Sequence, residues 1–166
     1  MWWSRLVVAL LAAALLHGCG FRPLYGKDSA DVTRSLAQVR VELIPDRNGQ
    51  RLRNLLLDRI NPAGEPARPA YALSVRISLS RTDLGIERDE TATRAVMVLN
   101  AEYSLRDTAN GKTLIEGTAQ STNSFNIVAS DFATLSGETD AVERASREIS
   151  DDIKTRLALY FRRTRG

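Results

Sequence analysis

Strict alternation of apolar and polar residues marks two segments of the chain as half-buried strands. Over 71–80 the odd positions hold Tyr, Leu, Val, Ile and Leu, and all but one of the even positions hold Ser or Arg. The same alternation returns over 95–105. Because successive side chains of a strand point to opposite faces, we expect one face of each strand to be buried and the other to be exposed to solvent.

Two further strands are predicted with less apolar character. Over 36–44 apolar residues alternate with polar ones until Pro45 ends the pattern. Over 113–125 the residues are mostly small and polar, and the segment follows an Asn110-Gly111 pair that suits a tight reversal. The last two predicted strands therefore form a hairpin.

Helical spacing of apolar residues predicts two helices. Leu52, Leu55, Leu56 and Ile60 recur at this spacing until Asn61-Pro62 stops the pattern, and the proline-rich segment that follows is expected to be a loop. A longer stripe follows the expected N-cap at Ser130-Asp131: Phe132, Leu135, Val142, Ala145, Ile149, Ile153, Leu157 and Tyr160.

Two details of this final helix can be predicted as well. Gly137 is expected to break or kink it near its start. Arg144 and Glu148 are four residues apart, so we expect them to pair on its polar side.

The element order is strand, helix, three strands, helix. Each predicted element has one apolar face, and the economical way to bury all of these faces is to pack both helices on one side of the sheet. We therefore predict an α+β fold, a two-layer sandwich of a four-stranded sheet and two helices (order βαβββα), as a single domain over 32–166.

Residues 1–18 have the pattern of an export signal. A short basic start that ends at Arg5 precedes the uncharged run Leu6–Leu16. This run is far shorter than the roughly 20 residues that a membrane-spanning helix needs. We expect the segment to be a cleaved signal peptide.

A lipid attachment motif ends this leader. Leu16-His17-Gly18-Cys19 resembles the bacterial lipobox, in which the cysteine receives a diacylglycerol and becomes the first residue after cleavage. Cys19 is the only cysteine of the chain, so no second cysteine is present to form a disulfide. We predict Cys19 as the lipidation site; the alternative is a buried free cysteine.

Lipidation predicts where the protein lies. Each buried CH₂ contributes about 0.8 kcal/mol, so several acyl chains hold a protein on a membrane without crossing it. Gly20 rather than Asp follows the cysteine, which favours the periplasmic face of the outer membrane. Residues 19–31 form the expected lipidated tether, whose Phe21, Leu24 and Tyr25 lie either at the membrane or partner interface or folded back over a sheet edge.

The residue types that are missing limit the chemistry. The only histidine, His17, leaves with the signal peptide, and the only thiol is acylated. Ser-His-Asp and Cys-His sites and zinc sites with nitrogen or sulfur ligands are thereby excluded. We predict no enzyme activity, no cofactor and no metal.

Charge adds one candidate site. The chain has 23 Lys and Arg against 20 Asp and Glu, an excess too small to argue for nucleic acid. Arg81, Arg88 and Arg94 lie at the end of one predicted strand, in the connection and at the start of the next. If these strands are antiparallel neighbours, the three guanidiniums converge and could contact glycolipid phosphates. Ion pairs with nearby carboxylates are the alternative: Asp83, Glu87, Asp89 and Glu90.

Three segments resemble one known family. They are "CGFRPLYG" at 19–26, "VMVLNAEYSL" at 96–105 and the helix from "DAVERA" at 140 to "LALYF" at 161. With the lipobox and the element order, they resemble the lipopolysaccharide-assembly lipoproteins of the LptE family. The resemblance implies a plug subunit inside a large outer-membrane β-barrel, LptD, that helps to insert lipopolysaccharide into the outer leaflet.

Two other classes share a lipid anchor and a small α+β domain. One is a periplasmic auxiliary lipoprotein of a lipid-trafficking ABC system, which should have a concave apolar cavity. The other is a pilotin-like lipoprotein that escorts a secretin. The sequence alone does not separate these classes from the barrel subunit.

Overall fold

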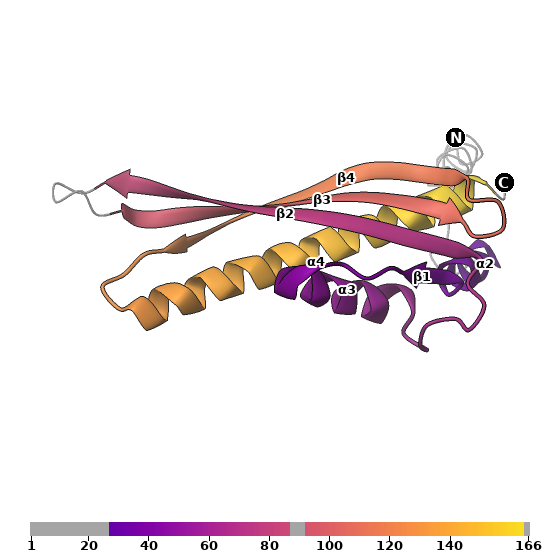
Figure 1. The fold of residues 1–166 in the computed structure, drawn as a ribbon, viewed down its shortest axis with the longest axis horizontal. Coiled ribbons are helices and arrows are strands. Elements are labelled where there is room, and N and C mark those ends of the chain that lie inside the picture. The colour runs from indigo at the N-terminus through magenta and orange to yellow at the C-terminus, as the bar shows by residue number, and fades with distance from the viewer. Residues whose placement is uncertain (1–26, 87–91, 165–166) are drawn as a thin grey trace, which may run out of the picture. The chain divides into compact units, whose positions relative to one another are not determined.

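The structure is a computed structural model that describes residues 27–86 and 92–164. The chain divides into two compact units, Met1–Ala30 and Asp31–Gly166, and the second contains the whole sheet (Figure 1). Cys19, the predicted lipidation site, lies outside the described residues, as do the tether residues Phe21, Leu24 and Tyr25 and the candidate contact Arg88.

The sheet has four strands in the order β1-β2-β3-β4. The strands are β1 (Val39–Val41), β2 (Tyr71–Ile86), β3 (Ala92–Asp107) and β4 (Thr113–Asn126). β1 pairs parallel to the start of β2, whereas β2, β3 and β4 form an antiparallel meander. The predicted four-stranded α+β fold is confirmed.

Three helices accompany the sheet: α2 (Lys27–Leu36), α3 (Asp46–Ile60) and α4 (Asp131–Arg163). α3 and α4 pack beside each other on the same side of the strands, which gives the two layers seen in Figure 1. α2 was not predicted. It occupies the end of the expected tether and ends at Leu36, the first residue of the expected strand. β1 itself is shorter than predicted, with three residues instead of nine.

The buried part of α2 explains this difference. Val32 is partly buried, and Leu36, four residues later, is buried. Residues four apart lie on one face of a helix, so these two can pack together against the core in helical form. The alternating stretch over 36–44 overlaps α2 only at Leu36, and β1 lies within the rest of it.

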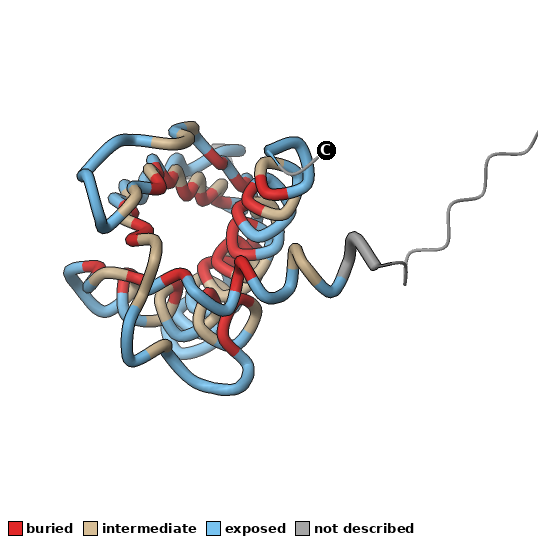
Figure 2. Tube along the Cα trace, turned by 90° about the vertical axis from the view of Figure 1, so that its right-hand side faces the viewer, coloured by how far each residue is buried: buried red, intermediate tan, exposed pale blue. Residues whose placement is uncertain are grey.

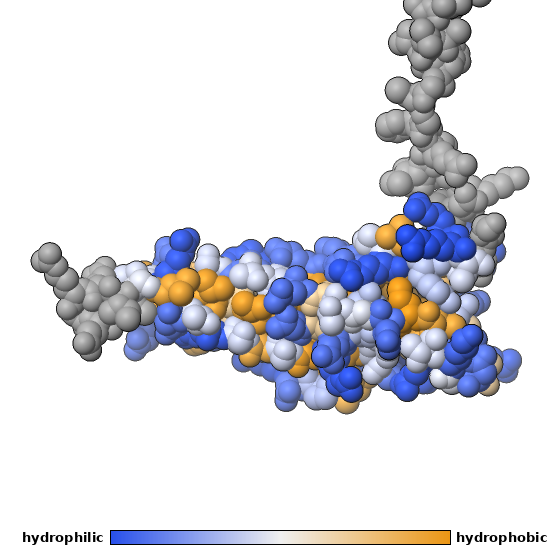
Figure 3. All heavy atoms as spheres, turned by 90° about the horizontal axis from the view of Figure 1, so that it is seen from above, coloured by the Kyte–Doolittle hydropathy of each residue, from blue (hydrophilic) through white to orange (hydrophobic). Residues whose placement is uncertain are grey.

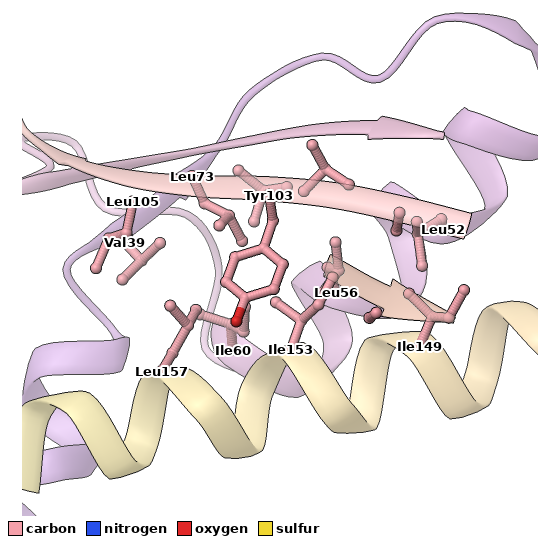
Figure 4. Close-up of a cluster of buried hydrophobic side chains, with 14 of the residues drawn as sticks. Val39, Leu52, Leu56, Ile60, Leu73, Tyr103, Leu105, Ile149, Ile153 and Leu157 are labelled. Atoms are coloured by element: carbon pink, nitrogen blue, oxygen red, sulfur yellow. The ribbon is translucent and has the colours of Figure 1, made fainter. Parts of the chain in front are cut away.

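The main core lies between the sheet and the two helices. Figure 4 shows Tyr103 of β3 pointing from the sheet towards Ile153 and Leu157 of α4, with Leu56 and Ile60 of α3 beside it. All of the apolar positions predicted on β3 are buried: Ala95, Met97, Leu99, Ala101, Tyr103 and Leu105. The period-two prediction for β3 is therefore confirmed.

β2 follows its prediction only along its first part. Leu73 and Val75 are buried, but Ile77 is half-buried and Leu79 is 38% exposed. β2 also continues as a strand six residues beyond the predicted end, to Ile86. A 15-residue α3 spans only about 22 Å, less than half the length of a 16-residue strand, so it covers only part of β2.

The final helix also differs from its prediction at the start. Ser130 is the N-cap as predicted, and the middle of the stripe, from Val142 to Leu157, is buried. Phe132 and Leu135, however, are 81% and 62% exposed, so their predicted burial is wrong. α4 is one helix from Asp131 to Arg163, so Gly137 does not break it.

Gly137 has a packing role instead. A Cβ atom placed on it would lie 3.4 Å from the Cβ of Phe125 on β4, and 3.5 Å from the ring of that residue. The absence of a side chain therefore lets the start of α4 lie close to the end of β4.

Candidate interaction surface

One face of the sheet is left open by the helices. α3 and α4 cover the face that carries the buried residues of β3, and none of the described elements covers the opposite face, which we call the outer face (Figures 1 and 2). It is formed by the even-numbered residues of β2, β3 and β4 from Ser74 onwards, because the strands pair in register with even opposite even.

The outer face is rich in hydroxyl groups. The Ser and Thr residues on it are Ser74, Ser78, Ser80, Thr82, Ser104, Thr118, Thr122 and Ser124. At its centre Ser78, Asn100 and Gln120 lie side by side on the three strands. Arg76 and Glu102 pair across β2 and β3 at 3.4 Å. This face can form many hydrogen bonds with a partner or with water while carrying little net charge.

The candidate arginines lie at the end of the sheet next to the β2–β3 connection. Arg81 is opposite the buried Met97, so it is on the helix side of the sheet, whereas Arg94 is opposite Leu84 on the outer face. They share one end of the sheet, as predicted. Their predicted convergence is wrong, because the pleat sends residues of opposite parity to opposite faces.

Arg81 is already held by carboxylates. Its Nε lies 2.8 Å from Asp83 and its Nη1 lies 2.9 Å from Glu138 of α4, while the guanidinium carbon lies 5.4 Å from the centre of the Phe125 ring. The hydrogen bond to Asp83 is the main cause that raises the pKa of Arg81. For Arg81 the ion-pair alternative is therefore confirmed, and a contact of Arg94 with glycolipid phosphate stays a prediction.

Exposed apolar side chains gather at the same end. Of the seven large hydrophobic residues that are exposed among the described residues, five lie on the second half of β2, just after β4 or at the start of α4: Leu79, Leu84, Val128, Phe132 and Leu135. Figure 3 views the domain from the side of the strands, and on that side it shows a band of hydrophobic residues that begins at this end of the sheet. The sequence pattern did not predict the exposure of Phe132 and Leu135, because they continue the apolar stripe whose later residues are buried.

A small cavity lies at the other end of the domain. It is a partly open cavity of about 220 Å³, lined by three aromatic residues, one leucine and two polar residues: Tyr71, Tyr160, Phe161, Leu114, Asp107 and Thr164. Ligand pockets usually enclose at least about 300 Å³ and are mostly apolar. This cavity is therefore smaller than a typical ligand pocket.

A series of hydrogen bonds between polar side chains, which we call the polar chain, links α4 to β4 in the middle of the domain. Arg144 donates to Asn123 at 3.1 Å, Asn123 donates to Ser121 at 2.8 Å, and Ser121 donates to Glu148 at 2.5 Å. Arg144 also pairs with Asp140. The predicted pair of Arg144 and Glu148 is therefore not direct: the two residues are joined through β4.

The match to a family model decides the class of protein. The model of the lipopolysaccharide-assembly proteins, LptE, matches residues 36–157, which is most of the chain and nearly all of the sheet and helices described above. The chain belongs to the LptE family. It is thus a lipoprotein of lipopolysaccharide assembly.

Other similar proteins agree with the fold. An uncharacterized protein of Rickettsia prowazekii is 24% identical over 152 residues, which cover 92% of this chain and 94% of that protein. A putative lipoprotein from Caulobacter crescentus superposes with a TM-score of 0.64 at 23% identity, covering 80% of this chain and 96% of its own. The rare lipoprotein B from Shewanella oneidensis gives 0.59 at 12% identity, covering 77% and 98%. These likenesses show the fold alone.

Two further observations concern membranes and metals. Among the described residues no helix is both long and apolar enough to cross a bilayer. In the same part of the chain no three His, Cys, Asp or Glu side chains are placed so that they could hold a metal ion together.

Proposed function

We propose that this member of the LptE family sits as a plug inside an LptD-type outer-membrane β-barrel and assists insertion of lipopolysaccharide into the outer leaflet. In this role the chain acts as a non-catalytic subunit on the periplasmic side of the outer membrane. Cys19 would carry the acyl chains that hold it there, and Phe21, Leu24 and Tyr25 would contact the membrane surface or the barrel wall.

The single observation that supports this role best is the outer face. The lumen of an outer-membrane barrel is polar, so a protein that fills it needs a surface that makes many hydrogen bonds without burying unpaired charge. The hydroxyl and amide groups of β2, β3 and β4 provide such a surface, and Arg76 and Glu102 neutralise each other on it. A helix layer on this side would have hidden these groups.

The first experiment tests whether this face meets a barrel. The full-length lipidated chain is purified from detergent-solubilised outer membrane with an affinity tag, and the co-purifying proteins are quantified. We expect a barrel of LptD type in a one-to-one ratio. An ABC-system component or a secretin in its place would support the auxiliary or the pilotin class and contradict the proposal.

A pair of matched variants makes this test specific for the outer face. Thr122→Arg puts a long cation on the outer face, and Thr155→Arg makes the same change at an exposed threonine of α4. We expect the first to reduce the recovered barrel at least several-fold and the second to leave it unchanged. Equal recovery with both variants would show that the outer face does not contact the barrel.

Cys19→Ser tests the anchor separately. Without the thiol no diacylglycerol can be attached, so the variant should remain an uncleaved or soluble precursor. If it still fractionated with the outer membrane after a high-salt wash, protein contacts alone would hold it there. Depletion of the wild-type protein should in addition sensitise cells to large hydrophobic antibiotics.

A further inference from the structure

β2 has an edge that the rest of the described chain leaves almost entirely unpaired. β1 pairs with only three of its residues, Tyr71, Ala72 and Leu73, and Glu42 donates to the carbonyl of Leu73 before the chain turns towards α3. Along Ser74–Leu84 the opposite edge of β2 pairs with β3, and no hydrogen bond within the described residues reaches the free edge. Figure 1 shows β2 continuing well beyond β1.

The direction of the free backbone groups follows from the bonds near β1. The N–H of Tyr71 and the C=O of Leu73 both point to the β1 side. Because these directions alternate along a strand, the N–H and C=O groups of Val75, Ile77 and Leu79 point to the same side, as do those of the following odd residues. The free edge thus presents donors and acceptors about 7 Å apart from one pair to the next.

Natural edge strands usually carry features that prevent pairing, such as lysine, proline or a bulge. Residues 71–86 contain no lysine and no proline, and the charged side chains on the helix side, Arg81 and Asp83, pair with each other in the second half of the strand. The irregular point among the described residues of β2 is Gly85, whose φ is 73°, at the far end. The edge of β4 is better protected, since α4 packs beneath that strand and Arg144 donates to the carbonyl of Ser124.

We propose that the free edge of β2 binds an extended segment of a partner polypeptide, which adds a fifth strand to the sheet. The side chains of β2 that face the helices along this free edge determine which partner segment can bind. Ile77 and Leu79 are partly exposed on the helix side, while Arg81 and Asp83 pair with each other. The segment therefore has uncharged, apolar residues at alternate positions, so that they pack on Ile77 and Leu79.

A second copy of this chain fits the edge less well. With both helix layers on the same side, an antiparallel pair centred on Ser80 would set Arg81 opposite Leu79 and Asp83 opposite Ile77. Each apolar side chain would then face a charge. Moving the centre towards Ile77 would bring the far end of one β2 onto β1 of the other copy.

The proposal concerns a different surface from the outer face, so it can fail while the barrel role holds, and the reverse. It is tested on the full-length chain in its own membrane. A benzophenone photo-cross-linking residue replaces Ile77, Leu79 or Asp83, one at a time, and the attachment sites are located by mass spectrometry.

Strand pairing predicts a regular pattern of cross-links. The three positions should attach to one linear segment of one partner. The attachment site should move by two residues between Ile77 and Leu79 and by four residues between Leu79 and Asp83. Attachment sites scattered over several segments would overturn the proposal. Reciprocal cross-links between two copies of this chain would also overturn it, in favour of self-association.

Two pairs of variants separate backbone pairing from general contact. Leu79→Pro removes an N–H from the free edge, whereas Leu79→Ala keeps it. Ile77→Lys places a charge on the packed side of the edge, whereas Ser78→Lys places one on the outer face. With the cross-linker at Asp83, we expect Leu79→Pro and Ile77→Lys to lower the yield about tenfold, a factor that corresponds to about 1.4 kcal/mol.

Leu79→Ala and Ser78→Lys should keep most of the yield. Thermal melts of the purified variants check that each is folded, and Ile77→Lys keeps the test valid if the proline variant does not fold. Equal yields for the members of both pairs would overturn strand addition at this edge.

Discussion

The half of the domain near β1 and the half near the β2–β3 connection share the same three long strands but are packed differently. In the first half, α3 and α4 together cover the sheet, and a large cluster of fully buried side chains lies between the layers. In the second half only α4 remains, and the buried cluster shrinks to five residues: Ala95, Met97, Phe125, Ala141 and Val142.

The polar chain lies at the boundary between the two halves. On β4, Ala119 belongs to the large cluster and Phe125 to the small one, and Ser121 and Asn123 come between them. Arg144 and Glu148 bind these two residues from α4. The apolar core is thus interrupted by a hydrogen-bonded layer that joins the sheet to the helix.

This difference indicates that the two halves have different roles, one in stability and the other in binding. Stability should depend mainly on the half with two helices, because buried apolar area supplies most of the free energy of folding. The other half keeps apolar side chains and a strand edge exposed, which is typical of surfaces that bind partners. Four predictions test this division, starting with the largest effect.

The same substitution on α4 should have opposite outcomes in the two halves. Leu157 is fully buried in the large cluster, so Leu157→Asp forces a charge into the core and costs several kcal/mol of a total stability of about 5 to 15 kcal/mol. We expect the protein not to accumulate. Leu135→Asp, at a position that is 62% exposed, should fold with a nearly unchanged melting temperature. A stable Leu157→Asp protein would contradict the two-layer core.

Removal of the aromatic ring from the small cluster should cost less but remain measurable. Phe125 is buried, packs against Gly137 and has the Arg81 guanidinium over its ring. Phe125→Ala should therefore lower the free energy of unfolding by about 3 kcal/mol. Hydrogen exchange should then accelerate at the ends of β2 and β4 more than around Ile153. Equal acceleration in both halves would show that they open as one unit.

The polar chain should contribute less to the free energy of unfolding than Phe125 does. Ser121→Ala removes the hydroxyl that joins Asn123 to Glu148, and we expect a loss of about 1 to 2 kcal/mol by chemical denaturation. Ser146→Ala is a matched control, because this buried serine only bonds to the carbonyl of Val142 in its own helix. If both substitutions lower the free energy of unfolding equally, the polar chain contributes no more than an ordinary buried serine.

The smallest effect concerns an ion pair between α3 and α4 in the stable half. Arg59 donates to Asp151, and this hydrogen bond is the main cause that lowers the pKa of Asp151. A carboxylate with a lowered folded-state pKa adds stability above its unfolded pKa of about 4, and this contribution is lost as the pH falls through the folded-state pKa.

Asp151→Asn should therefore cost at most about 1 kcal/mol at pH 7, because the carboxylate is largely exposed. The difference from wild type should disappear in thermal melts as the pH is lowered below 4. Asp58→Asn, at an exposed carboxylate of α3, serves as the control and should change stability little at either pH.

The amino-acid sequence determined the elements of the fold whose local pattern is unambiguous. The alternation in β3 extends over eleven residues and the stripe from Val142 to Leu157 over four turns, and both are buried as predicted. The proline-rich loop, the Asn110-Gly111 turn and the Ser130 cap also follow from local chemistry. The family resemblance, which the family model confirms, rests in part on the same two segments.

Only the tertiary structure decided which parts of these patterns are covered. Phe132, Leu135 and Leu79 lie in the same apolar patterns as buried residues, yet they are exposed, because the neighbouring elements cover only part of each pattern. Arg81 and Arg94 lie near the β2–β3 connection, one on each side of it in the sequence. The register of the two strands nevertheless places their side chains on opposite faces of the sheet. Periodicity fixes which side chains share a face of one element, whereas the lengths and registers of neighbouring elements fix what that face meets.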